Sequence, residues 1–221
     1  MVATHYATED GLPVDSTYAA AIDSQGFLWL ATHDGLARFD GWHFNIFDAA
    51  SSPRMSDNWI TDLFHDPQRR VYALASNGDL LSLRHDGVDP AMAEDGTPLS
   101  SVRFVQRKPL CVTQASGVSC VDGKGRFVRR MPFESGLGVA AALAAPGHRT
   151  WIIVPGCGIW LQLPGRRRTM LADGKLQPMP RSDEMALVDR AGDLWAVLGG
   201  HLLHARQNGS VSWPDAGDGR P

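Results

Sequence analysis

Short apolar runs separated by turns containing glycine, aspartate and proline recur along most of the chain. At the start of the chain, the alternation of apolar and polar positions predicts four strands, at residues 17–23, 27–32, 35–40 and 43–48. Alternation of this kind, interrupted by frequent breakers, is typical of antiparallel strands joined by tight turns. The pattern therefore predicts an all-β protein.

Two distant segments share one motif, an apolar residue followed by Asp-x-x-Gly-x-Leu-Trp, at residues 22–29 and 188–195. The aspartate can accept hydrogen bonds from the backbone just ahead of it, and the glycine can adopt a positive φ. Each motif therefore predicts a tight turn into a strand that begins with Leu-Trp.

Related units fill the interval between these two motifs. Their anchor residues are spaced 39 to 44 residues apart, and a glycine-led strand follows each: Trp29, Tyr72, Cys111, Trp151 and Trp195. A period near 40 residues is that of a propeller blade with four strands. We expect a β-propeller of four-stranded antiparallel blades, five of them present, at about residues 15–48, 57–90, 97–130, 138–172 and 183–213.

Two features of this arrangement leave alternatives open. The alanine-rich stretch at 139–145 could form a helix, but its register within the repeat favours a strand. The five blades could close a ring, or they could be the N-terminal part of a larger propeller. In the second case, residues 214–221 are a linker or the start of a missing blade.

Composition excludes several classes of protein. A hydrophobic fraction of 43% with 20% charged residues is typical of a globular chain rather than a disordered one. No apolar run approaches the roughly 20 residues that cross a bilayer, and residues 1–5 do not resemble a secretory signal. The formal net charge of −3 argues against a nucleic-acid partner.

The motifs resemble those of a known family. Gly11-Leu12-Pro13, the first Asp-x-x-Gly-x-Leu-Trp motif and the following Gly35-Leu36-Ala37-Arg38-Phe39-Asp40-Gly41 are similar to the two-component regulator propeller repeat. The similarity is strong over 11–47, good over 186–204 and weak between. It implies the extracytoplasmic sensor of a membrane-anchored bacterial receptor, whose cytoplasmic output domain is a histidine kinase or a diguanylate cyclase.

No catalytic constellation stands out in the sequence. His201 and His204 are three residues apart in a predicted strand, so their rings should face opposite sides and do not suggest a metal site. The basic run at 166–168 could bind an anion, but it has the composition of a solvated turn. We therefore expect no cofactor, no metal and no catalytic residue in this segment.

The three cysteines lack the Cys-x-x-Cys spacing of a zinc site. If residues 115–116 form a two-residue hairpin turn, Cys111 and Cys120 lie directly opposite each other on paired strands. That separation suits a disulfide, and the alternative is two small buried thiols. Cys157 has no assigned partner.

A ligand site should form where loops from several blades converge at one mouth of the propeller. The loops between second and third strands and the connections between blades supply its candidate residues: His33, Asp34, Asn77, Asp15, Asp57, Trp59 and Arg181. Aromatic and hydrogen-bonding groups of this kind suit a saccharide or another small polar ligand.

The sequence thus favours a non-catalytic module that senses a ligand or binds a protein and signals to the output domain of the same receptor, within a homodimer or alone. A propeller glycoside hydrolase or lyase is one alternative. A structural scaffold that binds proteins is the other.

Overall fold

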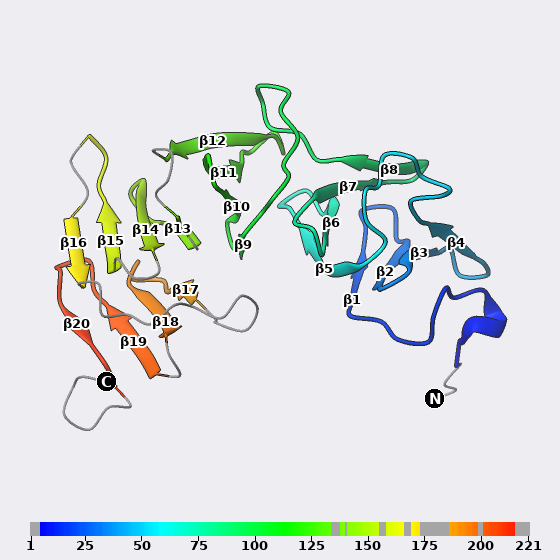
Figure 1. The fold of residues 1–221 in the computed structure, drawn as a ribbon, viewed down its shortest axis with the longest axis horizontal. Coiled ribbons are helices and arrows are strands. Elements are labelled where there is room, and N and C mark those ends of the chain that lie inside the picture. The colour runs from blue at the N-terminus through cyan, green and yellow to red at the C-terminus, as the bar shows by residue number, and fades with distance from the viewer. Residues whose placement is uncertain are drawn as a thin grey trace. The chain divides into compact units, whose positions relative to one another are not determined.

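The computed structural model of the 221-residue chain (Figure 1) describes residues 5–133, 138–139, 141–154, 158–165, 169–172, 186–198 and 201–214. It divides into two compact units. Unit 1 comprises Met1–Val102 and Ser119–Arg130, and unit 2 comprises Arg103–Val118 and Met131–Pro221. Within the described residues no helix is long and apolar enough to span a membrane.

The prediction of an all-β chain is confirmed, with five four-stranded antiparallel sheets in the described residues. A short 3-10 helix, η1 (Thr8–Asp10), precedes them. The first sheet contains β1 (Ala19–Ile22), β2 (Leu28–Thr32), β3 (Gly35–Phe39) and β4 (Phe44–Phe47). The second contains β5 (Ile60–His65), β6 (Val71–Ala75), β7 (Leu80–Arg84) and β8 (Gly87–Pro90).

The other three sheets repeat the same order of neighbouring strands. The third contains β9 (Phe104–Arg107), β10 (Leu110–Gln114), β11 (Gly117–Val121) and β12 (Phe127–Pro132). The fourth contains β13 (Ala141–Ala145), β14 (Arg149–Val154), β15 (Gly158–Gln162) and β16 (Thr169–Ala172). The fifth contains β17 (Ala186–Val188), β18 (Leu194–Leu198), β19 (His201–Ala205) and β20 (Val211–Ser212).

The repeated motif forms the predicted turn in the first sheet. One carboxylate oxygen of Asp23 accepts hydrogen bonds from the amides of Gln25 and Phe27, at 2.8 and 3.1 Å. The other oxygen accepts the indole N–H of Trp29 at 2.9 Å, and Gly26 has a φ of 93°. The aspartate therefore fixes both the turn and the orientation of the tryptophan that follows it.

The second sheet keeps this turn although its sequence departs from the motif. Asp66 accepts hydrogen bonds from the amides of Gln68 and Arg70, both at 2.9 Å. Arg69 stands where the motif has glycine and adopts the positive φ of 61° itself. In the fourth sheet, the alanine-rich stretch forms β13, as its register predicted.

Each unit has its own apolar core, and anchors of the repeat lie in both. In unit 1, Trp29 is fully buried in a cluster with apolar residues of β1–β3 and β5–β8. In unit 2, Trp151 is fully buried among residues of β13, β15, β18 and β19. Burying a large aromatic side chain contributes a few kcal/mol. The anchors therefore join neighbouring sheets within a unit.

Candidate functional site

Three loops of unit 1 meet at one end of the first two sheets. They are the β2–β3 turn, the β6–β7 turn and the connection from β4 to β5. In an antiparallel sheet with neighbouring strands in sequence order, these three connections leave from the same end. The amide of Ser76 donates to the carbonyl of Trp59 at 2.8 Å, and the Asn58 side chain donates to Asp34 Oδ1 at 3.5 Å.

Asp57 is the centre of this arrangement. Its Oδ1 accepts the amide of Trp59 at 3.0 Å. Its Oδ2 accepts the hydroxyl of Ser76 at 2.6 Å and the amide of Asn77 at 3.1 Å. One carboxylate thus ties the β4–β5 connection to the β6–β7 turn.

A second set of hydrogen bonds reinforces the same junction. The Asn77 side-chain amide donates to Ser56 Oγ at 2.8 Å and to Asp79 Oδ2 at 3.2 Å, and the Ser56 hydroxyl donates to Asp79. Gly78 lies between them with a φ of 89°, and a Cβ there would lie 3.0 Å from the backbone of Ser101 and Val102. Only glycine fits this turn without strain.

We call this set the polar loop cluster. Its members are Asp34, Ser56, Asp57, Asn58, Ser76, Asn77 and Asp79.

The hydrogen bonds around Asp57 also set its charge. Partial burial is the largest single influence and acts to raise the pKa of its carboxyl. The hydrogen bonds donated by Ser76, Trp59 and Asn77 favour the ionised form and together outweigh it, so the pKa of Asp57 lies below its ordinary value. Asp57 is therefore an anion at neutral pH.

Two exposed aromatic side chains lie beside the polar loop cluster. Tyr18 directly precedes β1 and is 52% exposed, and Trp59 directly precedes β5 and is 49% exposed. Their ring centroids are 6.5 Å apart, with the planes inclined by 34°. Aromatic rings with one apolar face in water provide contact area to a ligand with apolar and polar edges.

The structure brings together four of the seven predicted ligand-site residues. Asp34, Asp57, Trp59 and Asn77 all belong to the loops just described. His33 is exposed in the β2–β3 turn beside Asp34.

The remaining two predictions are not joined to this cluster by the hydrogen bonds described. Asp15 accepts the amide of Thr8 at 2.9 Å, seven residues earlier in the chain. Arg181 lies outside the described residues.

Sequence reasoning missed Tyr18, Ser56, Asn58, Ser76 and Asp79. Their signal was present in composition, since Ser56 to Asn58 and Ser76 to Asp79 are two short polar runs at equivalent ends of neighbouring sheets. Nothing in the linear sequence shows that the two runs hydrogen-bond to each other across 19 to 21 residues.

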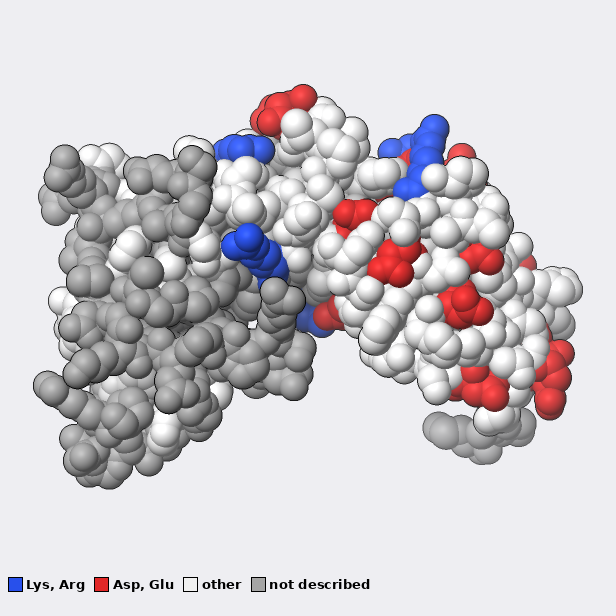
Figure 2. All heavy atoms as spheres, viewed as in Figure 1, with Lys and Arg blue, Asp and Glu red and all other residues white. Residues whose placement is uncertain are grey.

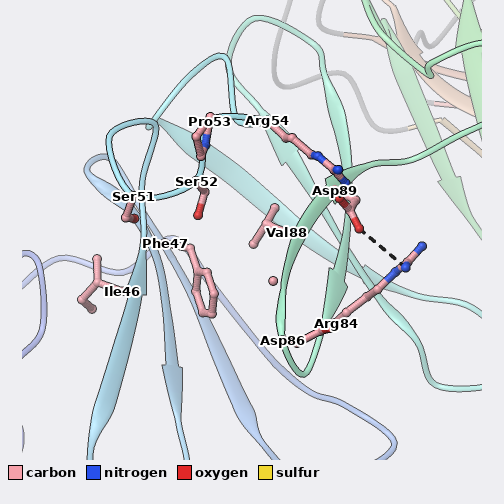
Figure 3. Close-up of a pocket in the computed structure, with 11 residues that line it drawn as sticks. Ile46, Phe47, Ser51, Ser52, Pro53, Arg54, Arg84, Asp86, Val88 and Asp89 are labelled. Atoms are coloured by element: carbon pink, nitrogen blue, oxygen red, sulfur yellow. Dashed lines mark hydrogen bonds and ion pairs between the residues drawn. The ribbon is translucent and has the colours of Figure 1, made fainter.

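A separate hollow of about 430 Å³ lies between β4, the start of the β4–β5 connection and β8 (Figure 3). Phe47 and Val88 line its floor, and Arg54 and Arg84 lie at its side. Both arginines pair with Asp89, Arg84 at 3.6 Å. Because Asp89 already neutralises much of this positive charge, the hollow is a weaker anion site than its two guanidinium groups suggest.

The charges on the visible face of unit 1 are mostly acidic. Figure 2 shows acidic side chains spread over that face and basic ones near its margin. Such a surface does not provide the positive field that holds a nucleic-acid backbone.

Cys111 in β10 and Cys120 in β11 are both buried, and both are disulfide-bonded. Strand β10 ends at Gln114 and β11 begins at Gly117, which leaves the two residues expected for a tight hairpin. That the two cysteines bridge each other remains a proposal. Counting free thiols before and after reduction tests it, and three free thiols in unreduced protein would contradict it. Cys157 and the basic run at 166–168 lie outside the described residues.

No family model matches the sequence, and neither does any curated protein. Solved structures do match. An extracellular domain assigned to a hybrid two-component system of B. thetaiotaomicron is 17% identical with a TM-score of 0.59, and the match covers 92% of this chain and 31% of that one. A second structure assigned to a one-component system of the same organism gives 17% identity and a TM-score of 0.58, over 89% of this chain and 30% of that one.

Other matched structures include a peptide-bound protein and a lyase. YCF48 bound to a D1 peptide is 13% identical with a TM-score of 0.57, over 91% of this chain and 68% of that one. Virginiamycin B lyase from Staphylococcus aureus is 10% identical with a TM-score of 0.52, over 89% of this chain and 69% of that one. At these identities the likeness shows a propeller-like fold, which hosts binding and lyase functions alike.

Proposed function

We propose that this chain is a ligand-sensing propeller segment of a membrane-anchored bacterial receptor, with the polar loop cluster and its two aromatic rings as the ligand-binding surface. Support comes from the resemblance to the two-component regulator propeller repeat and from the likeness to extracellular domains of two-component systems. The chain spans about 30% of the length of those domains. We therefore also propose that it is part of a larger propeller.

One observation carries the proposal of a ligand-binding surface. Tyr18 and Trp59 are both about half exposed, and they lie together beside the hydrogen-bonding groups of the polar loop cluster. Trp29 is buried in the core, and the more exposed Trp42 follows an aspartate that only closes its own turn. The cost of exposing apolar area is offset when a partner covers it in the functional state. Beside the rings, carboxylates, amides and hydroxyls offer the hydrogen-bonding groups that a polyhydroxylated ligand requires.

These features favour a saccharide as the ligand. The rings of Tyr18 and Trp59 can contact the C–H faces of a sugar. The carboxylate oxygens of Asp34 and Asp79 can accept hydrogen bonds from its hydroxyl groups. The acidic cluster disfavours anionic ligands, since like charges brought together without a counterion repel. We expect a neutral oligosaccharide to bind better than a sulfated or uronic one.

A thermal-shift screen tests this proposal, because a ligand that binds the native state raises the apparent stability. The panel holds neutral glucans, xylans and mannans beside acidic pectin and sulfated fragments. We expect the melting temperature to rise with at least one neutral oligosaccharide and with none of the acidic ones. A response to no saccharide, together with capture of a peptide partner, would favour the scaffold function instead.

A further inference from the structure

The fifth sheet and its turns contain a group of side chains that can bind a metal ion and that do not belong to the polar loop cluster. Asp189 directly follows β17, and its two carboxylate oxygens accept the amide of Asp193 and the indole N–H of Trp195, both at 3.0 Å. This is the turn that Asp23 forms in the first sheet. The aspartate of the motif is thus held in place by the fold.

His204 lies across the sheet from this turn. It pairs in register with Trp195 and stacks on its ring, with 3.8 Å between centroids and 9° between planes. The residue is 8% exposed. Its Nε2 is buried and makes no hydrogen bond, yet it lies 3.3 Å from Asp193 Oδ2.

Asp193 is turned towards the imidazole by a neighbouring segment. Its Oδ1 accepts the amide of Gln207 at 3.1 Å, which leaves Oδ2 facing His204. Ligand atoms of Asp189, Asp193 and His204 all lie within 4.8 Å of one another. Two carboxylates from a turn and one imidazole from a facing strand therefore lie close enough together to share an ion after small side-chain movements.

Comparison with the first sheet shows that two of these groups are not required by the repeat. The residue four positions after the motif aspartate is Phe27 in the first sheet, and the residue paired with the tryptophan is Arg38. There the guanidinium lies 4.8 Å from the Phe27 ring centroid. In the last sheet the same two positions hold Asp193 and His204, and together they replace a cation–π contact with two metal-ligating groups.

We propose that Asp189, Asp193 and His204 form a binding site for a divalent transition-metal ion, with Zn²⁺ as the best fit. Bonds of about 2.0 to 2.1 Å in tetrahedral geometry place neighbouring ligand atoms about 3.3 to 3.4 Å apart. The Asp193–His204 separation of 3.3 Å matches this spacing. An imidazole nitrogen with carboxylate oxygens suits Zn²⁺ and disfavours Ca²⁺ and Mg²⁺, which take oxygen ligands.

The site lies just beneath the surface, since the side chains of His204 and Asp193 are 10% and 17% exposed. Three protein ligands leave the fourth position of a tetrahedral ion to water. The bound ion would join the β17–β18 turn to β19 and would stabilise the last sheet when it binds.

Titration calorimetry with ZnCl₂ on tag-free, chelator-treated protein tests the proposal, and the absorption spectrum of the Co²⁺ complex reports the coordination geometry. We expect one ion per chain and a four-coordinate Co²⁺ spectrum. His204→Ala and Asp193→Asn should each weaken binding at least tenfold. His201→Ala is the matched control, because it removes the neighbouring histidine on the opposite face of β19, and it should bind as the wild type does.

A double variant distinguishes the loss of the metal ligands from unfolding of the sheet. Asp193→Phe with His204→Arg installs the pair found in the first sheet, so it should fold with an unchanged circular-dichroism spectrum and bind no Zn²⁺ at this site. Undetectable binding by the wild type, or equal affinity in the wild type, His204→Ala and the double variant, would overturn the proposal. The 3.3 Å approach would then be a simple histidine–aspartate ion pair.

Discussion

The two ends of the first two sheets carry the same residue types and differ in what those residues bind. At one end, Asp40 accepts the amides of Trp42 and His43, at 2.8 and 2.7 Å, within a single turn. At the other end, Asp57 accepts the amide of Trp59, and in addition the hydroxyl and amide of residues 19 and 20 positions later. One aspartate closes its own turn, and the other links two loops.

The tryptophans differ in the same way. Trp42 is 86% exposed, and it follows the aspartate of a short turn. Trp59 is 49% exposed and lies near Tyr18. An exposed aromatic ring is therefore not enough to indicate a ligand surface. At the polar loop cluster the backbone of Trp59 is held by a network that also presents hydrogen-bonding groups.

The largest expected effect comes from Trp29, which is buried in the core of unit 1 between the two ends. Because it is fully buried, Trp29→Ala should lower the free energy of unfolding by about 3 to 5 kcal/mol. Trp42→Ala, at an 86% exposed position, should change it by less than about 0.5 kcal/mol. Trp59→Ala removes a half-buried ring and should cost clearly less than Trp29→Ala. Urea denaturation measures all three. A loss at Trp59 as large as that at Trp29 would mean that Trp59 is a core residue rather than a binding one.

A smaller loss of stability should distinguish Asp57 from Asp40. Asp57→Ala leaves three hydrogen-bond donors from two loops without their acceptor, and we expect a loss of about 1 to 2 kcal/mol in the free energy of unfolding. Asp40→Ala affects only one exposed turn and should cost clearly less. Hydrogen exchange at the amide of Asn77 should accelerate only in the Asp57 variant. Equal losses in the two variants would contradict the cross-linking role of Asp57.

The smallest expected effect is on how the free energy of unfolding falls at acidic pH. The folded-state pKa of Asp57 lies below its unfolded value, so its contribution is complete above about pH 4 and is lost as pH falls through the lower folded value. The free energy of unfolding of Asp57→Asn should therefore fall less steeply between about pH 5 and pH 2 than that of the wild type. Parallel curves over this range would show that the carboxylate is not stabilised by its network.

The sequence was sufficient for the parts of the fold that depend on local chemistry. The Asp-x-x-Gly-x-Leu-Trp motif predicts its turn because Asp23 and Asp189 bind backbone amides two to four residues ahead. The same logic places Asp57 and Asn77 at one end of the sheets, since alternate connections leave an antiparallel sheet at the same end.

What the sequence could not supply were contacts between separate turns. The partners of Ser56 and Asn58 lie 21 and 24 residues away, and no local pattern selects them. The proposed metal site depends on the same kind of contact. Sequence spacing relates His204 only to His201 on its own strand, whereas Asp193 is brought to it by the register that pairs His204 with Trp195.

Whether the polar loop cluster binds a saccharide is decided by calorimetric titration. The oligosaccharide that gives the largest thermal shift is titrated into wild type, Trp59→Ala and Trp42→Ala. We expect Trp59→Ala to weaken binding at least tenfold, about 1.4 kcal/mol, and Trp42→Ala to stay within twofold of wild type. Equal affinity in all three proteins, or a larger loss at Trp42, would show that the polar loop cluster is not the ligand-binding surface.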